Sequence, residues 1–417
     1  MATRPRVIVI GGGFAGLSAV RTLRSAAADI LLIDRYNHHT FQPLLYQVAT
    51  AGLAAPSIAA PLRHILRSQR NATVLLGAAR HIDLQSRTLE VDGISHRYDF
   101  LVIATGSTHA YFGHDEWAGY APGLKTLQDA LRIRARILTA FERAEATDDP
   151  AERMEWLTFL IVGAGATGVE LAGTLAEIAR HTLKREFRRI DPAAARILLV
   201  EAGPRVLPAF PPALSAKARA QLEKLGVLVR TGRAVTGLDE RGVDIGKERI
   251  AARTVLWAAG VAASPLGASL GVGVDRAGRV PVTAQLSVVG HPEVFIAGDL
   301  AAMPEGMGLV PAIAPAAKQM GRHAAEAILA NMAGRRIGEF RYRHFGSLAT
   351  IGRMAAVVDF GRIRLSGLLA WWVWLTAHIY FLIGFRNRLV VLIDWAEAYW
   401  SYRRGARIII PTGGAEE

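Results

Sequence analysis

Short apolar runs that end at glycines alternate with helical patterns along most of the chain. The apolar run at residues 6–10 (RVIVI) precedes three glycines and a helical pattern, and a second apolar run at residues 29–34 (DILLID) follows. Strands of a buried parallel sheet are nearly continuous apolar runs, so this order predicts strand, turn, helix and parallel strand. The order returns at WLTFLIVGAGATGVELAGTLAEIA and ARILLVEAG. The sequence therefore predicts two α/β folds in one chain.

The hydrophobic pattern changes near the C-terminus. After an expected antiparallel strand or two at residues 344–360, residues 365–385 form 21 consecutive positions without Asp, Glu, Lys or Arg. About 20 apolar residues are enough to span a bilayer. Arginines lie on both sides of this run, at Arg362, Arg364, Arg386 and Arg388, and so give no positive-inside bias.

The segment that follows is amphipathic, which favours a helix lying in the membrane interface. A spanning helix and a dimer interface remain alternatives. The apolar positions at helical spacing are Leu392, Trp395, Ala396, Tyr399 and Trp400.

Each α/β fold carries a G-x-G-x-x-G fingerprint. The first glycine permits a tight turn, the second lets the backbone approach a pyrophosphate, and the third lets the helix pack on the strand. The pyrophosphate lies at the helix N-terminus, where free N–H groups favour anions. The glycines are Gly11, Gly13 and Gly16 in the first fold, and Gly163, Gly165 and Gly168 in the second.

An acid ends the second strand of each fold. Asp34 and Glu201 are both expected to bind ribose hydroxyls. Because a carboxylate repels a 2′-phosphate, Glu201 favours NADH over NADPH, and Arg205 nearby would weaken that preference. The basic insertion at residues 180–194 is expected to be a solvated helix end, with a partner site as the alternative.

Composition narrows the chemistry. The 417 residues are enough for two or three domains and carry a formal net charge of +13, which suits lipid and phosphate-bearing cofactors because Lys/Arg blocks of the nucleic-acid type are absent. The absence of cysteine excludes disulfides, thiolate metal sites and Fe–S clusters. The N-terminal apolar run is too short for a signal peptide, so we expect the chain to stay in the cytosol.

Two further strands end in turn signals, YDFLVIATGS and PEVFIAGDLA. Two fingerprints with an ATG turn between them and a GD turn after them resemble the two-dinucleotide-binding-domain flavoproteins. The resemblance implies FAD in the first fold and NAD(P)H in the second. Without cysteine, the disulfide reductases and sulfide:quinone reductases of this fold are excluded.

The whole chain resembles the type II NADH dehydrogenases. The motifs, in order, are HHTFQPLLYQVAT, IVGAGATGVELAG, EAGPRVLP, WAAGV, GDLAAMP, VPAIAPAAKQMG and FLIGFRNRLVVLIDWAEAYWSYRRGARII. The resemblance implies a single-subunit respiratory NADH:quinone oxidoreductase that does not pump protons and needs no metal. A hydride would pass from NADH to FAD N5, and two electrons would then pass to a membrane quinone.

The resemblance also implies domains and cofactor residues. The FAD domain would comprise residues 1–113 and 278–331, the NADH domain 114–277, and a membrane-association region 335–417. The FAD residues would be Gly11, Gly13, Phe14, Ala15, Gly16, Asp34, Arg35, Thr50, Ala79, Thr105, Gly106, Asp299 and Ala314. The NADH residues would be Gly163, Gly165, Thr167, Gly168, Glu201 and Gly260.

The resemblance assigns Glu170 and Gln319 to the catalytic site, and Gln47, Lys318 and Gln319 to the quinone site. Glu170 would assist proton or substrate handling near the flavin. Its alternative role is a carboxylate that suits the first turn of a helix. The alternative for Gln319 is a polar residue in a helix near the core, and the alternative for Lys318 is a solvated side chain. Pro315 replaces the first of two family glutamines, which weakens a two-glutamine gate.

The remaining residues and partners have simpler interpretations. His38 and His39 are expected to be structural, because hydride transfer needs no histidine base. The expected partners are NADH, a membrane quinone and an anionic lipid surface through residues 362–407, at the cytoplasmic face of the inner membrane. A homodimer remains open. The alternative functions are a reductase of a soluble electron carrier and a flavin-bearing redox sensor.

Overall fold

The computed structural model describes residues 4–308, 310–401 and 405–409, and the side chains of residues 399–401 lie outside the description. The chain forms two compact units, each assembled from separate stretches. Unit 1 contains Met1–Thr40, Ala60–Thr108 and Val261–Phe345, and unit 2 contains Phe41–Ala59, His109–Gly260 and Gly346–Glu417. The sequence prediction placed residues 41–59 in the first domain, whereas this segment packs with unit 2.

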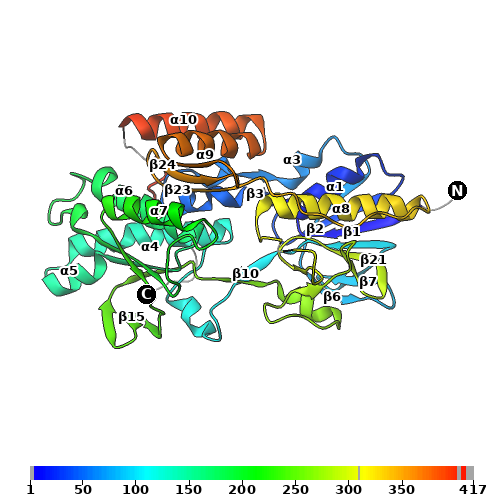
Figure 1. The fold of residues 1–417 in the computed structure, drawn as a ribbon, viewed down its shortest axis with the longest axis horizontal. Helices are drawn as coiled ribbons and strands as arrows, with labels where there is room; N and C mark the ends of the chain where they lie inside the picture. Colours follow the sequence, from blue (N-terminus) through cyan, green and yellow to red (C-terminus); the bar gives the residue numbers. More distant parts are fainter. Residues whose placement is uncertain (1–3, 309, 402–404, 410–417) are drawn as a thin grey trace. The chain divides into compact units, whose positions relative to one another are not determined.

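Unit 1 is built on a six-stranded sheet in the order β20-β21-β9-β1-β2-β5. Its strands pair in parallel except β20 with β21. Apolar residues of its central strands are almost fully buried, as expected for a sheet covered on both faces. Figure 1 shows α1 next to α8 in this unit. The bounds are β1 Arg6–Ile10, α1 Phe14–Thr22, β2 Asp29–Asp34, α3 Leu62–Leu66, β5 Ala72–Leu76, β9 Phe100–Ile103, β20 Ser287–Val288, β21 His291–Ile296 and α8 Ala314–Met332.

Smaller strands complete unit 1. An antiparallel β6-β7-β8 sheet and a parallel β19-β22 pair accompany the main sheet. Other short strands lie where the chain passes between the units. The bounds are β6 Ala79–Asp83, β7 Thr88–Val91, β8 Ile94–Arg97, β19 Val280–Pro281 and β22 Ala301–Ala302, with β3 His38–Thr40, β4 Ala59–Pro61, β10 Ser107–His109 and β18 Val261–Ala263 at the crossings.

Unit 2 contains the second predicted α/β fold. Its parallel sheet has the order β13-β12-β11-β17, and the antiparallel β14-β15-β16 sheet follows β13 in the chain. The bounds are α4 Leu127–Ala146, α5 Pro150–Trp156, β11 Thr158–Val162, α6 Ala166–Glu177, β12 Arg196–Glu201, α7 Pro212–Lys224, β13 Val227–Thr231, β14 Gly237–Asp239, β15 Gly242–Ile245, β16 Glu248–Ala251 and β17 Thr254–Trp257.

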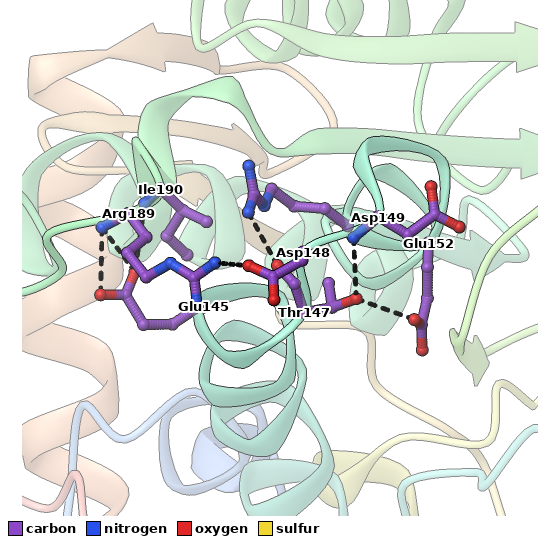
Figure 2. A network of polar contacts seen from close by, with 8 residues as sticks. Glu145, Thr147, Asp148, Asp149, Glu152, Arg189 and Ile190 are labelled. Carbon is purple, nitrogen blue, oxygen red and sulfur yellow. Dashed lines mark hydrogen bonds and ion pairs between the residues drawn. The ribbon is translucent and has the colours of Figure 1, made fainter.

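The basic insertion is held to the end of α4 rather than left as a free helix end. After α6, a π-helical turn at Ile178–Thr182 leads into the insertion. The Glu145 carboxylate accepts backbone N–H bonds from Arg188, Arg189 and Ile190 at 2.9–3.1 Å, and the Arg189 side chain pairs with Asp148 (Figure 2). These contacts satisfy three backbone donors that would otherwise need water.

The C-terminal part of unit 2 contains three antiparallel strands and two helices. The strands predicted at residues 344–360 are confirmed as β23 and β24, and β25 extends the sheet. α9 ends at Phe381, and Leu382 is extended before Gly384, whose φ is +89°. The apolar run at residues 365–385 therefore begins in β25, lies mainly in α9 and reaches α10 only at Phe385. Figure 1 shows the two helices side by side. The bounds are α2 Leu45–Ala49, β23 Ser347–Gly352, β24 Ala355–Asp359, β25 Arg364–Gly367, α9 Leu368–Phe381 and α10 Phe385–Ser401.

The helix pair exposes apolar side chains but does not contain a spanning helix. Within the described residues, every helix is too short or too polar to cross a bilayer. Leu369 is 68% exposed and Phe385 is 80% exposed. The residues of the predicted amphipathic face of α10 do not share one environment, because Leu392 is exposed whereas Trp395 is buried. Tyr399 and Trp400, predicted on the same face, have side chains outside the described set.

Candidate dinucleotide sites and the acceptor side

The first fingerprint forms a tight turn between β1 and α1. Gly11 has a φ of +102°, and a Cβ there would lie 2.4 Å from the Ala104 carbonyl oxygen. A Cβ on Gly16 would lie 1.8 Å from the Gly11 carbonyl oxygen, so only glycine permits this packing. Gly13 is the N-cap of α1 and has open space where a Cβ would be. This leaves the helix N-terminus accessible to a phosphate.

Asp34 stabilises this turn by accepting hydrogen bonds from backbone N–H groups. Its carboxylate accepts N–H bonds from Gly12 at 2.5 Å and from Tyr36 at 2.7 Å. Burial raises the pKa of Asp34, and these two hydrogen bonds oppose the shift. The carboxylate therefore lies beside the glycine turn at the end of β2, where the sequence predicted a ribose acceptor.

Other residues around this turn fit an FAD. Thr105 has a buried hydroxyl that finds no hydrogen-bond partner among the described residues, and Gly106 beside it has a φ of +67°. Ser107 donates to the Asp299 carboxylate at 2.6 Å. An unsatisfied buried hydroxyl is costly unless a ligand or water completes it, so this cradle suits a polar dinucleotide. Ser107 was not among the predicted residues, although it directly follows the ATG turn.

His39 supports the same turn. Its Nδ1 lies 2.9 Å from the Gly12 carbonyl oxygen, and its ring meets Phe14 edge-on at 5.0 Å. Burial lowers the pKa of His39 to about 4, so the ring is neutral at pH 7. Nδ1–H then donates to Gly12. The Lys318 ammonium lies 5.3 Å from the Phe14 ring centroid, and burial lowers its pKa.

The second fold repeats the first arrangement. Gly163 has a φ of +97°, and a Cβ on Gly168 would again lie 1.8 Å from the preceding glycine's carbonyl oxygen. Glu201 accepts N–H bonds from Ala164 and Gly203, both at 2.7 Å. Two separate stretches of sequence therefore build the same turn, with an acid fastened to the residue after the first glycine.

The rest of the second site is more open. Gly165 is the N-cap of α6, and Thr167 is exposed in its first turn. The Arg205 guanidinium donates to the Pro208 carbonyl at 2.9 Å, so this cation is engaged with its own loop. Phe112, which the sequence did not single out, places its ring 2.6 Å from the position of a Cβ on Gly260 and is 70% exposed.

Glu170 lies deeper in α6 than predicted. The helix begins at Ala166 and has no acid in its first turn, so the prediction of a first-turn glutamate is wrong. Glu170 falls one turn later because Gly165 already caps the helix. Burial raises the pKa of its carboxyl well above the ordinary range, and a backbone hydrogen bond from Thr350 opposes the shift. A dipole contact at the helix end therefore does not explain this residue.

Gln47 and Thr50 belong to the segment 41–59 in unit 2. The Gln47 amide donates to the Tyr46 hydroxyl at 2.8 Å and accepts from the Trp395 indole at 2.7 Å. Thr50 is buried and donates to the Tyr46 carbonyl. Gln47 lines a cavity of about 70 Å³ together with Thr174, Thr350 and the two tryptophans Trp374 and Trp395. This cavity adjoins the face of α6 that begins at Glu170, since Thr174 is one turn further along.

Gln319 has a structural role in unit 1, where it is hydrogen-bonded to the backbone of Arg343. Its amide donates to the Arg343 carbonyl and accepts the Arg343 N–H, both at 2.9 Å. This pair of bonds supports the structural alternative for Gln319. Ala314 begins α8 with Pro315 directly after it, where a proline loses no helical bond. Arg35 lies against Tyr36, with its guanidinium 5.1 Å from that ring, and Ala79 begins β6.

The comparisons decide the family. The model of the pyridine nucleotide-disulphide oxidoreductases matches residues 5–321, and that of the NDH2 C-terminal domain matches residues 344–403. The type II NADH:quinone oxidoreductase Ndh of Mycobacterium tuberculosis is 46% identical over 96% of this chain and 89% of its own length. The chain belongs to the type II NADH:quinone oxidoreductases. A second such oxidoreductase of the same organism, NdhA, is 44% identical over 97% of the chain and 89% of its own length.

Solved structures show how widely the fold of this type II oxidoreductase is shared. NDH2 from Plasmodium falciparum in complex with NADH aligns with a TM-score of 0.89 at 20% identity, covering 98% of this chain and all of that one. The sulfide:quinone oxidoreductase of Aquifex aeolicus aligns with a TM-score of 0.74 at 18% identity, covering 92% of each chain. These likenesses confirm the predicted α/β fold. The absence of cysteine separates this chain from enzymes that need a redox thiol.

Proposed function

We propose that this oxidoreductase takes electrons from NADH through an FAD held in unit 1 and passes them to a quinone in a membrane. The proposal rests on two glycine turns, at Gly11 and Gly163, whose backbones are hydrogen-bonded to the carboxylates of Asp34 and Glu201. The same chain contains an NDH2 C-terminal domain. We assign FAD to unit 1 and NADH to the α/β fold of unit 2, with residues 346–417 as the membrane-association region.

The FAD would be held by the residues of the first turn and its neighbours. Gly13 leaves the α1 terminus open for the pyrophosphate, and Asp34 accepts a ribose hydroxyl beside it. Thr105 and Asp299 offer polar groups for the rest of the cofactor. Bound FAD supplies the two-electron redox chemistry, for which the protein provides orientation and electrostatics. The wider proposed set is Gly11, Phe14, Ala15, Gly16, Arg35, Thr50, Ala79, Gly106 and Ala314.

The second turn would select NADH. Gly163, Gly165 and Gly168 hold the backbone for a pyrophosphate, and Glu201 presents a carboxylate where the 2′-hydroxyl of the ribose would bind. The Arg205 guanidinium donates to the Pro208 carbonyl of its own loop but keeps its positive charge, so it would weaken this preference without removing it. Thr167 in the first turn of α6 and Gly260 beneath Phe112 complete the proposed NADH residues.

The Glu201→Gln variant tests this selection. We expect discrimination between NADH and NADPH to shrink by about tenfold, because the charge that repels a 2′-phosphate is removed while an acceptor for a backbone N–H remains. Steady-state kcat/KM values with each nucleotide measure the effect. Glu223→Gln, which breaks an exposed pair with Arg219 on α7, is the control. Unchanged discrimination in Glu201→Gln would contradict the assignment.

Glu170 would hold a proton on the acceptor side. Its raised pKa keeps the carboxyl protonated at a pH where an exposed glutamate is ionised, and quinone reduction consumes protons. Gln47 lines the nearby cavity and Lys318 and Gln319 lie in α8, so we retain all three as candidates for contacts with the quinone.

The α9–α10 pair would hold the enzyme on the membrane as a peripheral, monotopic protein at its cytoplasmic face. Exposed apolar side chains on both helices, including Leu369, Phe385 and Ile393, form a surface that soluble monomers rarely show. The flanking arginines would meet anionic headgroups. The alternative of a soluble electron-carrier reductase leaves this apolar surface without a role.

Placing charges on this surface should release the enzyme from lipid. In the Leu369→Glu/Phe385→Glu variant, two apolar side chains, each worth about 1.5–3 kcal/mol when buried, no longer enter the interface. We expect vesicle partitioning to fall at least about a hundredfold in flotation with anionic vesicles. Ile94→Glu, at an exposed position on β8 of unit 1, is the control. Unchanged partitioning with a shift from dimer to monomer would assign the surface to a second copy instead.

One assay tests the central proposal. The purified protein in detergent should show flavin absorbance and oxidise NADH in the presence of a short-chain quinone, with NADPH as the poor substrate. Flavin absorbance without quinone-dependent turnover would overturn the proposal and favour a redox sensor.

A further inference from the structure

The segment 41–59 leaves the chain of unit 1 and is held by the C-terminal helices at three points. At its start, the Phe41 ring meets His378 of α9 edge-on at 6.1 Å. In its middle, Gln47 accepts the Trp395 indole N–H of α10 at 2.7 Å. At its end, the Ala59 carbonyl accepts from Asn387 of α10 at 3.2 Å. The residues on either side of the segment, Thr40 and Ala60, belong to unit 1.

The helix side chains that make these contacts are themselves fixed. His378 stacks on Trp374 at 4.3 Å and hydrogen-bonds the Trp374 carbonyl at 2.7 Å. Trp374 in turn packs against Trp395 at 5.3 Å between ring centroids. The exposures of Trp374 and Trp395 are 2% and 5%, so neither indole is available to lipid. Buried side chains of the helix pair therefore contact the segment, and α9 also packs on β24 and β25, whereas other side chains of the pair are apolar and exposed.

Gln47 contacts α10 and also lines a cavity that has both polar and apolar walls. Its amide is fixed at both ends, by the Trp395 indole N–H and by the Tyr46 hydroxyl. The Gln47 and Tyr46 side chains line the cavity that Thr174 and Thr350 also line. A side chain bonded at both ends loses little further entropy when a ligand binds, which is how supporting residues preorganise a site.

We infer that the segment 41–59 is a positioning element through which the membrane helices set the geometry of the quinone half-reaction, with Trp395 and Asn387 as positioning residues. The inference rests on the proposed quinone reductase function. It predicts that loosening the contacts with α10 impairs electron transfer to quinone while leaving electron transfer from NADH intact. The glycine turn and Glu201 of the NADH site lie outside the segment, and Thr50, the proposed FAD residue within it, is held by the Tyr46 carbonyl of the segment itself.

The test compares two tryptophan substitutions that each remove one indole hydrogen bond. Trp395→Phe removes the donor to Gln47. Trp156→Phe removes a donor to the Glu152 carboxylate at 3.2 Å, in a part of unit 2 away from the segment. We expect Trp395→Phe to lower quinone-dependent kcat/KM by roughly five- to tenfold. The anaerobic rate of flavin reduction by NADH should stay at the wild-type value, and Trp156→Phe should change neither quantity.

Further variants separate positioning from general damage. Gln47→Leu removes the bond from Trp395 and also the bond from Gln47 to the Tyr46 hydroxyl, so it should lower quinone-dependent kcat/KM at least as much as Trp395→Phe. The double variant should lose no more than Gln47→Leu alone, because the bond between the two residues is already absent there. Gln47→Glu keeps an acceptor for Trp395 and should retain more activity than Gln47→Leu. If Trp395→Phe does not fold, Asn387→Leu, which removes the donor to Ala59, provides the same comparison of half-reactions.

The outcomes are distinguishable from failure of the proposed function. A wild-type enzyme without quinone turnover would overturn the proposed function. An active wild-type enzyme with Trp395→Phe and Asn387→Leu indistinguishable from Trp156→Phe would overturn only the positioning role. Equal losses in both half-reactions would also overturn it, since that result indicates general destabilisation.

Discussion

Replacing Glu170 with glutamine is expected to lower quinone-dependent turnover by about a hundredfold, the lower end of what a positioned proton-transfer group contributes. Flavin reduction by NADH should change little in the same variant. The reason is that Glu170 is buried with a raised pKa, so it holds a proton that glutamine lacks while the shape of the side chain is kept. Steady-state turnover with a short-chain quinone and anaerobic stopped-flow reduction by NADH measure the two halves separately.

The same variant has a stability signature with a defined sign. Because the folded pKa of Glu170 is raised, the folded chain binds this proton more tightly than the unfolded chain. Wild-type stability therefore falls as pH rises from about 4.3, the ordinary glutamate pKa, toward the raised value. Glutamine does not titrate, so the Tm of Glu170→Gln minus that of the wild type should increase from pH 5 to pH 8. A constant difference would show that the carboxyl is not protonated in the folded enzyme.

Gly173→Ala should prevent normal folding of unit 2. Gly173 lies in α6 where β23 crosses it, and a Cβ there would lie 1.5 Å from the Ile351 carbonyl oxygen. The obstruction is backbone rather than a flexible side chain, so helix and strand must separate. We expect a loss of at least about 3 kcal/mol in the free energy of unfolding, measured by thermal or denaturant unfolding of any soluble fraction.

A matched change in the same helix provides the control. Ala172→Gly alters the neighbouring residue without adding an atom and should cost about 1 kcal/mol from helix propensity. If Gly173→Ala were as stable as Ala172→Gly, the close approach of α6 and β23 would be wrong.

The sequence predicted the parts of this protein in which local chemistry determines structure. The two glycine turns need positive φ at Gly11 and Gly163 and have no room for a Cβ at Gly16 and Gly168. A turn with these requirements leaves a fixed pattern in the sequence. The acids Asp34 and Glu201, at the ends of β2 and β12, belong to the same repeated pattern of strand, glycine turn, helix and strand. The fold class could be predicted for this reason.

Features that depend on distant contacts could not be predicted in the same way. Trp395 matched an amphipathic pattern with Leu392, yet it is buried, with its ring against Trp374 and its indole N–H bonded to Gln47. Periodicity records the spacing of apolar residues along one helix, not which partner covers them. The pattern also did not show that α6 begins at Ala166, which places Glu170 in its second turn. The sequence could not show the hydrogen bonds between Gln319 and Arg343, because these residues are 24 positions apart. The placement of Gln319 at the quinone site stays a prediction.

The interleaving of the two units has a consequence for biosynthesis. Unit 1 needs residues as late as Phe345, and unit 2 combines Phe41–Ala59 with the stretch that begins at Gly346. On the ribosome, the early segment 41–59 must wait for almost the entire chain before α9 and α10 emerge to cover it. Long-range closure of this kind slows folding and leaves apolar surface uncovered in the meantime. Nascent chains should therefore engage chaperones until synthesis of the last helices, and the moment of final folding should coincide with the moment when the proposed membrane-binding surface first exists.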